Sequence, residues 1–549
     1  MKKLIWFDSV LMRIITITFI LALALAGCRK DQSQGGTISA EGGSGAIFQN
    51  LSFTWYKNYD WYSAERWAFD KDGEKWIQRT YGVNIQFLDA GGAANQKLAT
   101  MLIDDEYPDV VSVERDATLQ SLIQAGAAIP LDGYLEKYSN MRKYLGDGTI
   151  NLLRADDGKL YVFPNWAAPL GQLSGNSGWL LQKKYHDALG NPPLDTYDDL
   201  YAYLNMIKNR YPNVVPLEVG RDLPTEAIRA LYGGFGSNLN PAYAVSYLYR
   251  DGNTLKSILE DPHYQETLLF INKLYRERLI TQDLFTITDD ILKERIRNGL
   301  VGIACLSDIF DSDNVIIPNA ELKDEDPLSD LLPINPIRAA GVPLNEVMTN
   351  FSNCAGWNVN VITKDAKNPE QIFAFLDWMF GNEGQLVLVY GEPGKYFVPG
   401  EYNDYGYPIK MTDAFYNATN EEIDGEWSET NWVGNTAFVD NMARYIYDNT
   451  GFAQQLKLDQ FNFTWNHSID STELTNTIPA LDTPEGILFQ NIDNIYLQAI
   501  PAIITASSEE RSRALMTDYL RELKAAGLDR LLEYQTGIFT ENLRKLGKN

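Results

Sequence analysis

The chain has 549 residues, of which 45% are hydrophobic and 22% charged, so it is long enough for several globular domains and too apolar to be disordered throughout. Its formal net charge of −26 opposes binding to phosphate backbones, and we expect no nucleic-acid partner. Its three histidines match no common metal motif and its three cysteines are too few for a disulfide scaffold, so we predict no metal site and no cofactor.

The first 27 residues are typical of a secretory signal peptide. A basic leader precedes Ile14–Leu25, an uncharged and mostly apolar run that is shorter than the ~20 residues of a membrane span. The sequence Leu25-Ala26-Gly27-Cys28 resembles a bacterial lipobox, in which the cysteine is diacylated. An ordinary signal peptide that ends in cysteine is the alternative. Residues 28–46 follow as a glycine-rich flexible tether, so we expect Cys28 to anchor the folded body to a membrane.

Strand and helix patterns alternate in the first part of the body, which predicts a mainly parallel sheet covered by helices. The predicted strands are 47–55, 83–87 and 110–113, and the predicted helices end near Tyr81 or lie around 98–102 and 119–123. In such sheets, ligands bind beyond the carboxyl ends of the strands.

The same alternation returns further along the chain, which favours two α/β units with interleaved segments. Strands are predicted at 179–181 and 301–306, and helices at 197–211 (capped by Thr196), 262–279, 369–380, 485–504 and 509–527.

Five separated stretches resemble one protein family when they are taken together and in order. They are Asn95–Leu102 with Tyr107-Pro108-Asp109-Val110-Val111, Gly158–Pro164, Leu189–Thr196 with its helix, Asn368–Trp378 with Tyr390–Gly394, and Ala526–Asp529. Behind a lipobox, this order resembles the lipoprotein type of extracellular solute-binding proteins of carbohydrate ABC importers, large relatives of maltodextrin-binding protein.

The resemblance implies a two-lobe, periplasmic-binding-protein-like α/β fold of type II. Each lobe would be a mainly parallel sheet flanked by helices, and a hinge would join the two. We assign residues 47–164 and 298–355 to the first lobe, and 165–297 and 356–549 to the second.

The resemblance also implies a binding protein rather than an enzyme. It would be a lipid-anchored monomer on the outer face of the plasma membrane of a bacterium, typically Gram-positive. It would capture an oligosaccharide, for which plant polysaccharides are one source, and deliver it to the permease of an ABC importer by hinge closure. The alternative is a secreted glycoside hydrolase or another carbohydrate-active enzyme, although the sequence singles out no catalytic pair of carboxylates.

Many longer members of the family carry a calcium loop after the helix equivalent to 197–211. In this chain the corresponding segment, Asn209–Pro216, lacks the acidic ligands that a hard cation needs. Residues 70–74 look superficially like a calcium loop, but the twelfth position from Asp70 is Tyr81 rather than a carboxylate. The sequence therefore predicts no calcium site.

A sugar site needs aromatic rings that cover the C–H faces of a pyranose and polar side chains that pair with its hydroxyls. The best cluster is Trp55–Tyr62, directly after the first strand, although Trp55 and one or two neighbours could equally belong to the core. Within it we choose Trp61, Asn58 and Asp60 as ligand contacts. Further candidates follow other strands or lie at the lobe crossings, and they are Glu114, Arg115, Asn165, Trp166, Asn353 and Trp357. Tyr232 lies in a glycine-flexed aromatic loop, Tyr232–Phe235, that could form a wall of the cleft, and Trp432 lies in the segment Glu426–Phe438, which could cover a subsite.

Three assignments stay open from the sequence alone. Arg115 could recognise a uronate carboxylate through its guanidinium or form a surface salt bridge. Cys305 and Cys354 could form a disulfide or remain two buried thiols. Trp179 could be core or platform, whereas Trp378 lies inside a predicted helix and is expected in the core.

Overall fold

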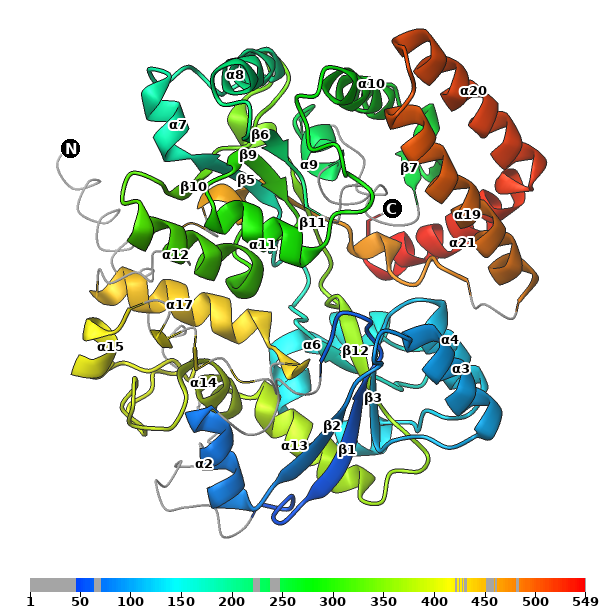
Figure 1. The fold of residues 1–549 in the computed structure, drawn as a ribbon. Helices are drawn as coiled ribbons and strands as arrows, with labels where there is room; N and C mark the ends of the chain where they lie inside the picture. Colours follow the sequence, from blue (N-terminus) through cyan, green and yellow to red (C-terminus); the bar gives the residue numbers. More distant parts are fainter. Residues whose placement is uncertain are drawn as a thin grey trace, which may run out of the picture. The chain divides into compact units, whose positions relative to one another are not determined.

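The computed structural model describes residues 46–63, 71–220, 228–236, 247–419, 422–423, 425–426, 428, 432–450, 459, 462–479 and 483–548. The signal peptide, Cys28 and the tether up to residue 45 lie outside the described residues. Residues 43–549 form one compact unit, whose arrangement is drawn in Figure 1. Within the described residues, no helix combines the length and apolarity that a membrane crossing requires.

One sheet organises the first lobe, with the strand order β2-β1-β3-β12-β4 in the described residues. Its strands are β1 (Ser52–Lys57), β2 (Asn84–Leu88), β3 (Val110–Glu114), β4 (Phe163–Asn165) and β12 (Asn358–Ile362). The helices of this lobe are α2 (Asp72–Tyr81), α3 (Ala94–Asp104), α4 (Ala117–Gln124), α5 (Asp132–Leu135), α6 (Asn140–Leu152), α13 (Pro369–Phe380), α14 (Asn382–Tyr390), α15 (Asp413–Asn417) and α17 (Thr436–Thr450). The predicted strands after 47, 83 and 110 are confirmed.

A second sheet, with the order β10-β5-β9-β6, organises the second lobe. Its strands are β5 (Gly178–Gln182), β6 (Val215–Glu218), β9 (Val301–Leu306) and β10 (Leu331–Ile334), and a hairpin is made by β7 (Leu248–Asp251) and β8 (Thr254–Ser257). The helices are α7 (Lys183–Ala188), α8 (Tyr197–Arg210), α9 (Ile228–Gly233), α10 (Pro262–Arg276), α11 (Asp289–Arg297), α12 (Ile317–Glu325), α19 (Pro484–Ile504), α20 (Glu509–Ala525) and α21 (Leu528–Lys545). Short helical turns are η4 (Ile258–Glu260), η5 (Ser312–Ile316), η6 (Leu344–Glu346), η8 (Trp465–His467) and η9 (Thr472–Leu474).

The helix predicted after Thr196 shows why the sequence patterns work locally. The Thr196 hydroxyl accepts from the Asp199 N–H while the Asp199 carboxylate accepts from the Thr196 N–H, which is a complete capping box at the start of α8. Leu200 and Leu204 then fall on one face of the helix and are fully buried in the core of the second lobe.

Each sheet contains one strand that runs against the others. β12 is antiparallel to β3 and β4, and β5 is antiparallel to β9 and β10. Both strands follow a crossing from the other lobe, so they enter their sheet at the edge where the other strands end. The carboxyl ends of β1, β3 and β4 therefore share one edge with the amino end of β12, and we call this the hinge edge of the first sheet.

Strand pairing corrects two of the sequence-based lobe assignments. Residues 298–355 were predicted in the first lobe, but β9 pairs with β5 and β6 of the second sheet. Residues 356–549 were predicted in the second lobe, but β12 joins the first sheet and α13 is buried in the first core. The error arose because a short apolar strand does not reveal which sheet completes its hydrogen bonds.

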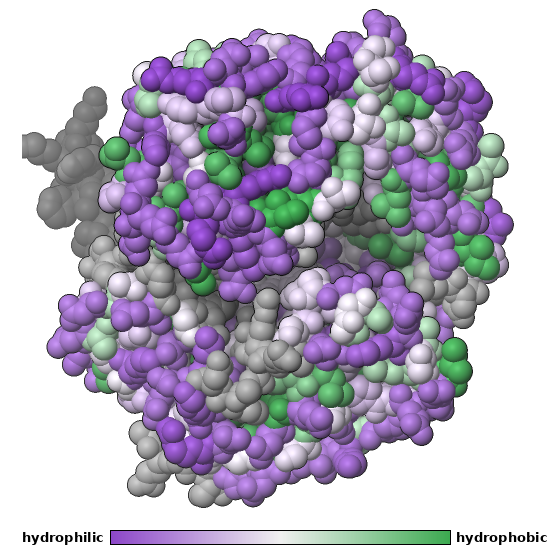
Figure 2. Space-filling view, viewed as in Figure 1, coloured by the Kyte–Doolittle hydropathy of each residue, from purple (hydrophilic) through white to green (hydrophobic). Residues whose placement is uncertain are grey.

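The crossing segments lie side by side and form the hinge. β11 (Asn350–Ser352) lies in the second crossing and β13 (Ser468–Asp470) lies in the third. The two strands pair in parallel, so these crossings are hydrogen-bonded to each other. Two hydrogen bonds tie the first crossing, between β4 and β5, to the second. Ala168 N–H donates to the Cys354 carbonyl at 2.8 Å, and Ser174 N–H donates to Ser352 Oγ at 3.1 Å. Figure 2 shows that the surface is hollowed where the two lobes meet.

Candidate functional site

Three polar side chains stand in a row on the hinge edge of the first sheet. Glu114 ends β3 and is paired in register with Asn358, the first residue of β12, which is in turn paired with Asn165 at the end of β4. Residues that are directly opposite on neighbouring strands point to the same face of the sheet. Glu114 is exposed, whereas Asn358 and Asn165 are buried.

Five aromatic rings pack beside this row. The Trp432 ring is the centre of the group: Trp61 stacks on it at 6.0 Å between ring centres and 15° between planes, and Tyr59, Tyr62 and Trp357 lie within 5.3–5.8 Å. Trp432 is only 4% exposed, whereas Trp61 is 47% and Trp357 is 42% exposed. The cluster therefore presents two half-open indole rings on a buried aromatic base, and we call Trp61, Trp357 and Trp432 the platform.

Buried amides hold the base of the platform in place. Asn360 donates from Nδ2 to the Trp432 carbonyl at 2.6 Å, and Asn165 accepts from Gly434 N–H at 2.8 Å. Beneath the rings, the buried Lys57 ammonium lies 3.4 Å from the centre of the Trp55 ring and 4.2 Å from that of Trp432. These contacts tie the segment after residue 431 to the sheet, so Trp432 is a rigid support.

Trp357 is positioned by the residue before it. Gly356 has a φ of +75°, and a Cβ at this position would lie 2.0 Å from the Asn165 carbonyl oxygen, so no other residue fits here without a shift. The Gly356 carbonyl accepts from Arg115 Nε at 3.1 Å and also from Arg115 Nη2. The guanidinium therefore fixes the start of β12 and with it the direction of Trp357.

Glu114 contacts solvent yet is surrounded by protein, which is the situation of a side chain in a recess. Burial, followed by the nearby negative charge of Asp116, raises the pKa of Glu114 to about 7 against the opposing influence of Arg115. Burial and then the negative charge of Glu114 raise the pKa of Tyr59. Asn358 links the two by donating from Nδ2 to the Tyr59 hydroxyl at 3.0 Å.

The remaining predicted residues of the first lobe have structural partners. Asn58 is half-buried and accepts from the Tyr56 hydroxyl at 3.0 Å, and Asp60 is exposed and accepts from Ala94 N–H at the start of α3 at 2.7 Å. Trp166, with a left-handed φ of 53°, is half-buried beside the platform segment and donates its N–H to the Gly434 carbonyl at 2.8 Å. Asn353 lies in the hinge and donates from Nδ2 to Thr475 Oγ1 at 3.1 Å.

Tyr232 is not a wall of the cleft, because it is fully buried in the core of the second lobe and bonds Asp261 through its hydroxyl. The glycines after it do not make a flexible loop, because both lie close against other segments of the chain. A Cβ on Gly233 would lie 2.1 Å from the Met348 carbonyl oxygen, and one on Gly234 would lie 2.0 Å from the Tyr197 hydroxyl. They serve close packing, and we remove Tyr232 from the candidate site.

Trp432 and Trp357 were expected to approach from the lobe opposite Trp61, but all three belong to the first lobe.

The sequence reasoning missed the polar residues at the hinge edge of the second sheet. Asp308 follows the carboxyl end of β9 and accepts from Asn176 Nδ2, just before β5, at 3.0 Å. Glu114 was selected because ligands bind beyond the carboxyl ends of strands. The same rule would have selected Asp308 if β9 had been assigned to the correct lobe.

Three open assignments are settled by burial. Cys305 and Cys354 are buried and are not joined by a disulfide, and Trp55 and Trp179 are fully buried core residues. Trp378 is only partly buried, in an aromatic cluster with Phe48 and its neighbours, and its Nε1 donates to Glu383 at 3.0 Å. It packs against the first core without being enclosed by it.

No candidate metal site is found in the described part of the chain, where no group of three or more His, Cys, Asp and Glu side chains could hold an ion. The segment after α8 is the one in which longer members of the family carry a calcium loop. In this chain residues 211–214 make a single turn, closed by Val214 N–H donating to the Tyr211 carbonyl at 3.0 Å, and β6 begins directly after it.

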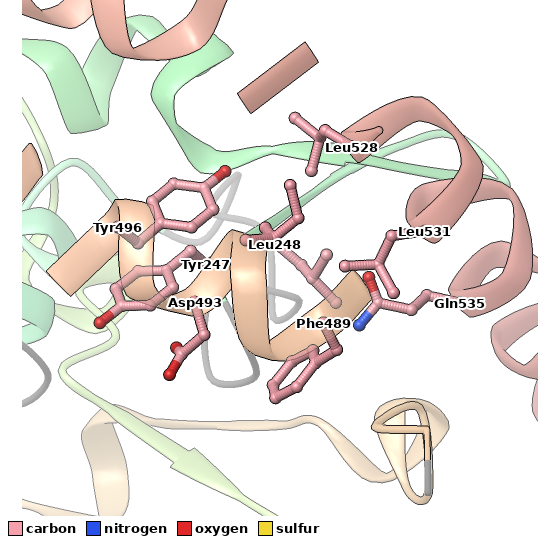
Figure 3. Close-up of a pocket in the computed structure, with 9 residues that line it drawn as sticks. Tyr247, Leu248, Phe489, Asp493, Tyr496, Leu528, Leu531 and Gln535 are labelled. Atoms are coloured by element: carbon pink, nitrogen blue, oxygen red, sulfur yellow. The ribbon is translucent and has the colours of Figure 1, made fainter. Parts of the chain in front are cut away.

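The cavity in Figure 3 lies in the second lobe, away from the platform, between β7, α19 and α21. Its volume of about 10 Å³ is the space that one water molecule needs. Both amide atoms of Gln535 in its wall are buried without a hydrogen-bond partner in the structure. It is a hydration site at most and cannot hold a sugar ring.

No protein-family model matches the sequence, and no curated protein is similar enough to be matched. The structure is similar to that of the alginate-binding protein AlgQ2, described without calcium ion, with a TM-score of 0.62, 17% identity, and coverage of 89% of this chain and 98% of that one. It is similar to the ABC-transporter substrate-binding protein FusA of Streptococcus pneumoniae in complex with kestose (TM-score 0.63, 16% identity, 89% and 99% covered). It is also similar to the N-glycan transport solute-binding protein NgtS of Streptococcus pneumoniae in complex with Man5GlcNAc (TM-score 0.53, 16% identity, 90% and 98% covered). The predicted fold is thereby confirmed: the chain has the two-lobe α/β fold of ABC-transporter substrate-binding proteins over nearly the whole length of both partners.

Proposed function

We propose that this protein is the solute-binding component of a carbohydrate ABC importer and that it captures an oligosaccharide between its lobes. The observation that carries the proposal is the platform, in which Trp61 and Trp357 expose half of their surface at the hinge edge while Trp432 supports them from below. Exposed indole faces next to a carboxylate and amides match the apolar faces and hydroxyl rim of a pyranose. Ligand would bridge to the second lobe near Asp308 and stabilise a closed arrangement through contacts made only there.

The similar structures support this choice of ligand class. The proteins that share the fold are described as binding alginate, kestose or an N-glycan oligosaccharide. FusA is named a substrate-binding protein of an ABC transporter and NgtS a transport solute-binding protein, so we propose a binding protein rather than an enzyme.

We further propose that the protein works on the outer face of the bacterial plasma membrane. The signal peptide would direct export, the diacylated Cys28 would provide the only membrane contact, and the tether would leave the body free to meet a permease. After removal of residues 1–27 the net charge is −28, which would keep the body from lying flat on anionic lipid.

A glycan screen on the mature chain tests this function. We expect at least one oligosaccharide to raise the melting temperature, to bind with a 1:1 stoichiometry by calorimetry, and to yield no new reducing ends on long incubation. Release of reducing ends would favour a hydrolase, and the absence of any glycan ligand would contradict the proposal.

A further inference from the structure

We propose that the platform selects against acidic sugars, that Glu114 is the residue that determines this specificity, and that the ring bound at the platform is an uncharged or amine-bearing one. The inference rests on the proposed function, and it names the ligand class that this edge can accept.

Carboxylates gather around the platform in the part of the chain that the structure describes. Glu114 is exposed beside the rings, Asp116 follows it at the start of α4, and Asp60 is exposed in the loop that carries Trp61. Lys57 is fully buried beneath the rings, so its ammonium cannot contact a ligand that lies on the platform surface. An ionised sugar carboxylate placed on Trp61 or Trp357 would meet like charges in a partly desolvated recess.

Arg115 is the residue that would recognise a uronate, and its guanidinium is already engaged. Recognition of a carboxylate uses two parallel N–H groups of the guanidinium fork. In this structure Nε and Nη2 of Arg115 both donate to the Gly356 carbonyl. Arg115 is therefore a positioning residue for Trp357, and the Nε–Nη2 edge of its guanidinium is not available to a uronate.

Glu114 can exist in two forms at the pH of the cell surface. Burial and Asp116 keep its pKa near neutrality, and the charged and titratable groups that face it in the described residues are Asp116, Arg115 and Tyr59. Opposite Glu114 in register, the buried Oδ1 of Asn358 has no hydrogen-bond partner in the structure. When Glu114 is protonated, its O–H can donate to this oxygen of Asn358, because the two side chains form a cross-strand pair. When Glu114 is ionised, its full negative charge remains at the platform.

The discrimination should therefore depend on pH in a defined direction. Above the pKa of Glu114 the ionised carboxylate repels an acidic sugar, and below it the repulsion is relieved while the sugar carboxylate remains ionised. A neutral sugar feels no such change in charge repulsion.

The test uses a matched pair of probes on the mature chain. A panel of neutral and acidic oligosaccharides is ranked by thermal shift, and the best neutral ligand is then oxidised at its primary hydroxyls to give the corresponding uronate. We expect the neutral form to bind at least tenfold more tightly at pH 8, and this ratio to shrink severalfold at pH 5.5. In Glu114→Gln the ratio should be smaller at pH 8 and should no longer change with pH.

Glu106→Gln is the matched control, because it removes the same charge from an exposed residue just before β3, at the opposite edge of the same sheet. The ratio in this variant should remain that of the wild type. The inference is overturned if an acidic glycan ranks first in the panel, or if Glu114→Gln folds normally and keeps the wild-type ratio and pH dependence. If no glycan of either charge binds, the proposed function itself has failed, which is a different result.

Discussion

Replacing Trp61 by alanine should weaken glycan binding strongly while the protein remains folded. Trp61 is 47% exposed, so about half of its ring surface is free to cover a sugar. An aromatic side chain presents ~150–250 Å², so about 100 Å² is available, which corresponds to roughly 2.5 kcal/mol at ~25 cal/mol per Å². We therefore expect a loss of affinity of about fiftyfold.

The stability of this variant should change less than its affinity. The buried half of Trp61 packs against Trp432, Tyr59 and Tyr62, and aromatic pairs of this kind contribute ~0.5–1.5 kcal/mol each beyond their area. Trp61 and the preceding Asp60 are both exposed, so this change is not a full core truncation and we expect a loss of about 1–2 kcal/mol in the free energy of unfolding.

Trp179→Ala is the matched control, because Trp179 is fully buried in the core of the second lobe. Its truncation should cost ~3–5 kcal/mol of stability while the folded fraction binds glycan normally. Calorimetry with the glycan found in the screen and thermal melts of both variants decide the question. The platform would be refuted if Trp61→Ala bound glycan with wild-type affinity, or if it unfolded the protein to the extent that Trp179→Ala does.

Four further outcomes follow from the charges and the anchor. Glu114→Gln should raise the free energy of unfolding by about 1 kcal/mol at pH 8 and leave it unchanged at pH 4. Because the pKa of Glu114 is raised, its ionisation costs stability only as the pH rises towards 7, and contact with water reduces that cost. Thermal melts at both pH values check this. Arg295→Met should destabilise by ~3–5 kcal/mol, since it leaves the fully buried Glu218 carboxylate without the guanidinium 2.6 Å away, and adding Glu218→Gln should restore part of the loss in denaturant titrations. Cys28→Ser should release the protein into the medium, as seen by cell fractionation; retention on washed membranes would contradict lipidation. EDTA should leave the melting temperature and glycan affinity unchanged, and a drop reversed by calcium would show that a metal site exists.

Strands of both sheets could be predicted from sequence because alternation and short apolar runs are local signals. Val110–Glu114 and Val301–Leu306 were both found in this way. The sheet to which β9 belongs could not be predicted, since it is a short buried run and its partners are chosen by the route of the chain through the hinge. The crossings before β5 and β12 reverse the direction of those strands, and nothing in the residues of either strand encodes that reversal.

The sequence could predict that site residues lie at strand ends, whereas it could not predict which of their side chains are exposed. Trp61 and Trp357 are half exposed, but Asn165 and Trp432, which were also selected as ligand contacts, are buried and support them. The difference arises from contacts across long sequence separations, such as Asn165 accepting from Gly434 and Asn360 donating to Trp432. A sequence pattern shows that a tryptophan follows a strand, but only the packed segment from the other end of the chain determines whether its ring faces water.

Glu114 and Arg115 show how neighbouring residues at one strand end acquire separate tasks. Glu114 is the last residue of β3 and shares a face with Asn358, which brings its carboxylate beside the rings. Successive residues of an extended chain point to opposite sides, so Arg115 is turned away towards the Gly356 carbonyl. The cation that would have neutralised an acidic sugar is thereby used to orient Trp357, while the anion remains at the platform. The same local geometry that makes the platform rigid thus also determines the charge of the ligand that it can accept.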